Sequence, residues 1–126
     1  MVDLENKILK VVLQPKGAEL TSIYRKQNQL EYMWGGDPNV WGKHSPVLFP
    51  IVGTLKENTF LYVGKKYHLP RHGFARDKVF SIIEVASDSV TFLLEDDKET
   101  YEVYPFHFMV FLTLDYGLQK ELILFA

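Results

Sequence analysis

Residues 45–53 read SPVLFPIVG and residues 69–77 read LPRHGFARD, and the rest of the chain is ordinary strand and turn sequence around these two runs. In the first run, Pro46 and Pro50 bracket three apolar residues. The run is therefore hydrophobic enough for burial but lacks two backbone N–H donors that a central strand needs. An apolar segment of this kind suits the floor of a cleft. The sequence predicts that residues 47–52 are largely buried beneath a binding site.

The second run has the composition of a binding site. His72 stands between Arg71 and Gly73, and glycine allows the backbone a positive φ or a close approach to a bound molecule. An imidazole can exchange a proton near neutral pH. Arg71 and Arg76 flank the histidine with planar guanidinium groups that suit the recognition of hydroxyls or anions. The sequence therefore predicts that these three side chains line a cleft.

Composition narrows the possible functions. The chain has 126 residues, 47% of them hydrophobic and 14% aromatic, which predicts a single globular domain over residues 1–126. A net charge of −2 with dispersed lysines argues against nucleic acid as a partner. No apolar run is long enough to span a membrane and the start does not resemble a signal peptide, so we expect a cytoplasmic protein without a membrane partner. Without cysteine or a metal- or nucleotide-binding motif, the sequence predicts neither a metal site nor a cofactor.

Short apolar runs separated by turns at intervals of roughly ten residues predict an all-β, antiparallel β-sandwich. The charge run at residues 95–99 is expected to form the tip of a loop, because it cannot be buried unpaired. The expected strands are residues 8–13, 18–24, 30–34, 58–62, 65–69, 79–85, 89–94, 101–103, 106–114 and 118–125.

Besides the two runs and Trp41, the chain has the motifs GAEL at residues 17–20 and YPF at residues 104–106. With these motifs it resembles the aldose 1-epimerase (mutarotase) family, most of all its LacX-like branch. The resemblance extends to about residue 113 in the family's order. It implies a galactose mutarotase-like β-sandwich, of which this chain would be an incomplete N-terminal part. It also implies a sugar ligand, no cofactor, and a role in the exchange of α and β anomers by acid/base ring opening.

The resemblance assigns roles to individual residues. His72 matches a family histidine that hydrogen-bonds the sugar and supports catalysis, so it is the candidate catalytic and substrate-binding residue. The family's acid, a histidine in mid-chain, and its base, a glutamate near the C-terminus, have no counterpart here. Thr54 stands where the family usually has an arginine, and Arg71 where close relatives often have glutamine. Arg76 keeps the family pattern, either for substrate binding or for a structural contact with Asp77 or a strand-end carbonyl.

Two further residues are candidates for substrate binding. Trp41 could form a platform for a sugar ring, although packing in a core or lid is the more common role of a tryptophan. His44 immediately precedes the apolar run and could face the cleft. His68 and His107 alternate with aromatic residues and are expected to be plain strand residues.

Three functions remain open at this point. The chain could be the N-terminal part of an aldose 1-epimerase that is inactive alone, a non-catalytic carbohydrate-binding or interaction domain, or a gene remnant that folds only with a partner copy. The chain ends at Ala126 inside an apolar segment, so its last strands are expected to have bare edges. We therefore expect the isolated chain to self-associate through its C-terminal strands or to aggregate.

Overall fold

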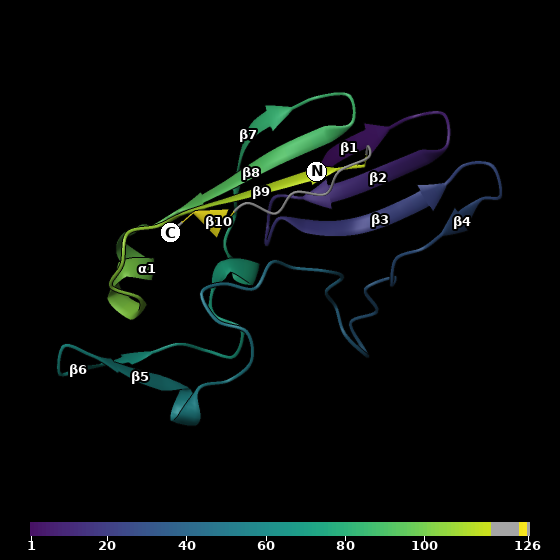
Figure 1. Cartoon of the computed structure of the whole chain (residues 1–126). Coiled ribbons are helices and arrows are strands. Elements are labelled where there is room, and N and C mark those ends of the chain that lie inside the picture. The colour runs from purple at the N-terminus through teal and green to yellow at the C-terminus, as the bar shows by residue number, and fades with distance from the viewer. Residues whose placement is uncertain (117–123, 126) are drawn as a thin grey trace.

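A computed structural model describes residues 1–116 and the backbone of residues 124–125. The chain begins with a four-stranded antiparallel sheet in which strands follow one another in chain order (Figure 1). A positive φ at Gly17 and Ala18 turns the chain between the second and third strands. The strands of this sheet are β1 (Val2–Glu5), β2 (Leu9–Gln14), β3 (Glu19–Arg25) and β4 (Leu30–Glu31).

A second four-stranded antiparallel sheet has the order β10-β9-β8-β7. A short helix, α1 (Lys98–Val103), connects β8 to β9. The strands of this sheet are β7 (Ser81–Val85), β8 (Ser89–Glu95), β9 (Met109–Asp115) and β10 (Leu124–Phe125). The all-β, antiparallel fold expected from the sequence is therefore confirmed.

The two sheets share one hydrophobic core. Alternate residues of β1 and of β8 are buried, as the two-residue period of a strand requires. These two strands contact each other, which brings the apolar faces of the sheets together. The buried apolar residues in the core cluster are Val2, Leu4, Val11, Leu13, Ala18, Ala75, Phe80, Val90, Phe92, Leu94, Phe108 and Val110.

The long connection between the sheets contains little regular structure. A hairpin, β5 (Thr59–Tyr62) and β6 (Lys65–His68), lies away from both sheets (Figure 1). Phe60 and Tyr67 stack across it, with ring centroids 5.3 Å apart. Two 3₁₀ turns, η1 (Lys56–Asn58) and η2 (Ala75–Asp77), flank the hairpin, and the second lies next to the candidate site.

The structure corrects the expected strand at residues 101–103, which belong to helix α1 instead. The helix starts at a capping box: Asp97 Oδ1 accepts the Thr100 N–H, and Thr100 Oγ1 accepts the Asp97 N–H, each at 2.8 Å. This pattern specifies a helix N-terminus. The charge run at 95–99 therefore ends β8 and begins α1, and does not form the tip of a loop.

The expected strand at 30–34 is also shorter than predicted, since β4 ends at Glu31. The Glu31 carboxylate accepts the N–H groups of Ile23 and Met33, at 2.9 and 2.8 Å, and this turns the chain away from the sheet. Tyr32 and Trp34 are consequently exposed. Conversely, strand β1 was not expected from the sequence.

Most of the expected strand at 118–125 lies outside the described residues. Its last two residues, Leu124 and Phe125, form β10 and pair with Val110 and Met109 of β9. His107, expected in a strand, lies just before β9 and contacts Asp96. Among the described residues, none of the helices is long and apolar enough to cross a membrane.

Candidate functional site

The two sequence runs are hydrogen-bonded to each other. The His72 N–H donates to the Gly53 carbonyl, and the Gly53 N–H donates to His72 Nδ1, both at 2.8 Å. Just after His72, the backbone N–H groups of Phe74 and Ala75 both donate to the Phe49 carbonyl, at 3.0 and 3.1 Å. The histidine loop, residues 70–74, is therefore held on the apolar run by hydrogen bonds of its backbone and of the His72 ring.

Gly73 makes this close approach possible. Its φ is +70°, and a Cβ atom there would lie 2.2 Å from the Phe49 carbonyl oxygen. Only glycine therefore fits between the two runs without a shift of the backbone. His72 itself has a φ of +67°, a left-handed conformation that is uncommon for a residue with a side chain.

The apolar run is less buried than the sequence predicted. In the range 47–52, every residue but one is half-buried, and Val52 is 77% exposed. Val47 and Phe49 pack against the edge of the core, where the Phe49 ring lies 4.9 Å from that of Phe108, centroid to centroid. The run joins no strand, as its prolines predict, and so it lies over the core and not within it.

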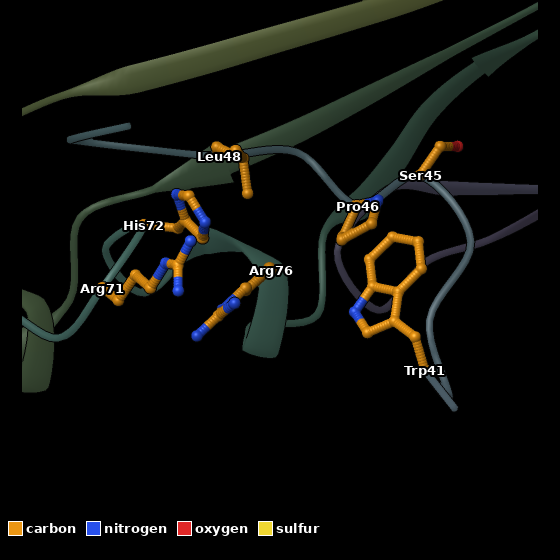
Figure 2. A pocket seen from close by; sticks show the side chains of 7 residues that line it. All are labelled: Trp41, Ser45, Pro46, Leu48, Arg71, His72 and Arg76. Carbon is orange, nitrogen blue, oxygen red and sulfur yellow. The ribbon is translucent and has the colours of Figure 1, made fainter. Parts of the chain in front are cut away.

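A pocket of about 460 Å³ opens beside the two runs (Figure 2). One side is formed by the Trp41 ring, and the other by His72 and the two arginines, which come from the histidine loop and from η2. The pocket is lined by Trp41, Ser45, Pro46, Leu48, Arg71, His72 and Arg76.

Three polar side chains of this pocket, those of Arg71, His72 and Arg76, are hydrogen-bond donors. Because Nδ1 of His72 accepts the Gly53 N–H, the ring of neutral His72 carries its proton on Nε2, which is left to donate to a ligand. Arg71 is exposed. The Nε of Arg76 lies 3.6 Å from the Asp77 carboxylate but makes no hydrogen bond to it. Three donor groups therefore face an apolar wall, which suits a ligand with many hydroxyl oxygens and an apolar face.

The structure brings together four of the five predicted site residues, Trp41, Arg71, His72 and Arg76. His44 is not among the residues that line the pocket; its ring lies against Gly36, and its Nδ1 lies 3.8 Å from a Glu19 carboxylate oxygen. Ser45, Pro46 and Leu48 line the pocket but were not predicted individually, although all three belong to the run that marked the site.

Elsewhere, an open pocket of about 510 Å³ lies beside helix α1. His107 Nδ1 lies 2.8 Å from Asp96 there, and this hydrogen bond, with one from the Phe108 N–H, lowers the pKa of Asp96. In the part of the chain that the structure describes, no three histidine or acidic side chains are grouped as a metal site would require.

Comparison with known proteins gives consistent matches. A model of the family described as aldose 1-epimerase matches residues 1–124. The plasmid-encoded protein LacX of Lactococcus lactis subsp. lactis is 36% identical over 112 residues, which are 85% of this chain and 37% of LacX.

Solved structures share the fold. A galactose mutarotase related enzyme from Lactobacillus acidophilus superposes with a TM-score of 0.90 at 44% identity, over 92% of this chain and 39% of that one. A galactose mutarotase-like protein from Lactobacillus casei ATCC 334 superposes with a TM-score of 0.89 at 33% identity, over 94% of this chain and 40% of that one. The chain thus spans well under half the length of these similar proteins.

Proposed function

The chain belongs to the aldose 1-epimerase family, and from that premise we propose that its pocket binds an aldose as part of a site that interconverts α and β anomers. The observation that carries the proposal is the connection between His72 and Gly53. The Gly53 N–H occupies Nδ1 of the His72 ring and leaves Nε2 as a donor. The pocket that this ring lines also contains two guanidinium groups and a tryptophan ring.

Each side chain then has a role in binding. The His72 Nε2–H donates to an oxygen of the sugar, and Arg71 and Arg76 donate to further hydroxyls. The Trp41 ring, 48% exposed, packs against the apolar face of the sugar. These contacts orient the sugar, and in the family reaction such a donor near the reacting atoms also stabilises charge as the ring opens.

Ring opening needs two more groups. A base takes the proton of the anomeric hydroxyl while an acid protonates the ring oxygen, so the ring opens to the aldehyde and closes again on the other face. The family resemblance assigns the acid histidine and the base glutamate to positions that these 126 residues do not include. We therefore expect the chain alone to bind an aldose without accelerating anomer exchange.

Nuclear magnetic resonance tests both parts of the proposal. Galactose and glucose, and their 6-phosphates because two guanidiniums also suit an anion, are titrated into the 126-residue chain while anomer exchange is followed in the same samples. Binding should be seen, and His72→Ala should weaken it by about tenfold, the effect of losing about one hydrogen bond to the sugar. Accelerated exchange would contradict the expected lack of activity.

His107→Ala is the matched control. His107 is 83% exposed and lies outside the pocket, so its loss should leave sugar binding unchanged. Absence of binding for every aldose tested, in a chain that is folded, would overturn the proposed function.

A further inference from the structure

Glu19 is a buried carboxylate outside the pocket. It is 3% exposed, and a buried carboxylate is costly unless both of its oxygens find donors. One oxygen accepts the side-chain amide of Gln14, its partner across the β2–β3 ladder. The other oxygen accepts the backbone N–H of His44, a residue 25 positions further along the chain. The carboxylate thus joins the first sheet to the loop that precedes the apolar run.

His44 closes this loop. Its ring packs so closely on Gly36 that a Cβ atom there would lie 2.6 Å from the ring carbon Cε1. The loop from residue 36 to residue 44 therefore begins and ends at a single contact. Since the His44 backbone is held by Glu19, the base of the loop is fixed to the start of β3.

Trp41 lies within the same loop. The backbone N–H of Trp41 donates to the Asp37 carbonyl at 2.8 Å, and the backbone carbonyl of Trp41 accepts the indole N–H of Trp34 at 2.9 Å. These bonds fix the Trp41 backbone relative to the loop. The loop is also anchored by the ion pair between Lys43 and Asp77 at 3.1 Å, whose carboxylate is 59% exposed. Exposed ion pairs contribute little, so the buried Glu19 contact is the stronger anchor.

We infer that Glu19 is a positioning residue that, through His44, sets the place of the Trp41 ring on the wall of the pocket. The importance of this place for sugar binding rests on the proposed function. His44, expected from the sequence to touch substrate, acts instead through the position of Trp41. Neither Glu19 nor His44 is among the residues that line the pocket, so both act by positioning Trp41 and not by touching the substrate.

Fluorine resonances of protein labelled with 5-fluorotryptophan provide the test. The chain has two tryptophans, so the resonance that is missing in Trp41→Phe identifies Trp41. Glu19→Ala should move the Trp41 resonance of the sugar-free protein toward that of free 5-fluorotryptophan and weaken aldose binding by about tenfold. Glu19→Gln should restore both, because its amide oxygen can accept the His44 N–H and its NH₂ can donate to a flipped Gln14.

Asp96→Ala is the matched control, since Asp96 also accepts a backbone N–H, that of Phe108 at 3.0 Å, but lies just after β8 of the other sheet. It should lower the melting temperature without moving the Trp41 resonance. If Glu19→Ala does not fold, Glu19→Asp replaces it, because a side chain one methylene shorter cannot reach both Gln14 and His44. An unmoved Trp41 resonance in the folded Glu19 variants would overturn the inference. A failure of the proposed function is recognised separately. In that case no added aldose shifts the Trp41 resonance of the unsubstituted protein.

Discussion

At the scale of single residues, the candidate site depends on backbone that few residue types can adopt. His72 and Gly73 are consecutive residues with positive φ, +67° and +70°. Such a conformation costs of order 1 to 3 kcal/mol at a residue with a side chain, and it persists only where the surroundings hold it. Here the reciprocal bonds between His72 and Gly53 hold it. The cost is thus offset by the contacts that orient the imidazole.

Gly73→Ala should therefore destabilise the chain strongly. The new Cβ would lie 2.2 Å from the Phe49 carbonyl oxygen, which is fixed by the N–H groups of Phe74 and Ala75. Gly64→Ala is the control: φ there is +72°, but a Cβ would have nothing within 4 Å. Urea denaturation should show a loss of about 1 to 2 kcal/mol at Gly64, from the left-handed backbone alone, and at least about 2 kcal/mol more at Gly73. Equal losses at both positions would contradict the close approach.

Much of the site could be predicted at this scale. His72, Arg71 and Arg76 lie within one short run, so local sequence was enough to place them near one another. His44 was expected to face the cleft but is not among the residues that line the pocket, and its backbone is held by Glu19, 25 residues away. A glutamate in an otherwise ordinary strand gives no local sign that it is buried. The resemblance to the family identified the segment around Glu19 but not this contact.

At the scale of elements, the Asp97 carboxylate both caps helix α1 and joins it to the rest of the chain. The Asp97 carboxylate accepts the Thr100 N–H and pairs with Lys78 at 3.0 Å, and these contacts lower the pKa of Asp97. The unfolded carboxyl protonates near its ordinary pKa of about 3.9. The stabilisation is therefore fully present above this pH, and is lost as the pH falls through the lower pKa of the folded state.

Asp97→Ala should lower the free energy of unfolding by about 1 kcal/mol at pH 7. The difference between the unsubstituted chain and this variant should shrink as the pH falls below about 4. Asp97→Asn is the control, because asparagine also caps a helix but does not titrate in this range. Urea denaturation at pH 7 and at pH 3 measures the difference in the free energy of unfolding between each variant and the unsubstituted chain. A difference that is the same at pH 7 and at pH 3 would show that the charge of Asp97 contributes nothing.

The elements show why the predicted strands were only partly right. Strand β8 was found because burial on one face leaves a two-residue period of apolar residues. Helix α1 was missed because its six residues are too few for a helical stripe, although its capping box was present at Asp97 and Thr100. Strand β4 was predicted too long because hydrogen bonds to the Glu31 side chain, not sequence period, end it.

At the scale of the whole molecule, scaffold and site come from different parts of the chain. The core is built largely from strands of the two sheets, whereas every residue that lines the pocket belongs to the connection between them, from Trp41 to Arg76. Loops positioned by a rigid scaffold commonly carry function. Substitutions in the pocket should therefore affect binding with little effect on the core.

One edge of the second sheet is apolar. Among the described strands, β7 ends this sheet, and all of its residues are exposed. It carries Ile82, Ile83 and Val85, which are 42%, 50% and 57% exposed, and a single charge, Glu84. The sequence pointed to the C-terminal strands for self-association, and most of the last expected strand lies outside the described residues. Strand β7 is a described edge with the features that favour pairing with another strand.

We therefore expect the chain to self-associate at micromolar concentration through strand β7, with a second copy adding its own strand to the sheet edge. Ile83→Lys should shift the sedimentation coefficient toward that of a monomer, because a lysine on an edge strand opposes pairing between sheets. Val63→Lys is the control: Val63 is 85% exposed, but lies at the turn of the β5–β6 hairpin and not on this edge. If apolar exposure alone drove association, both substitutions would reduce it. If both left the sedimentation coefficient unchanged, β7 would not be the contact and the C-terminal strands would become the segment to test.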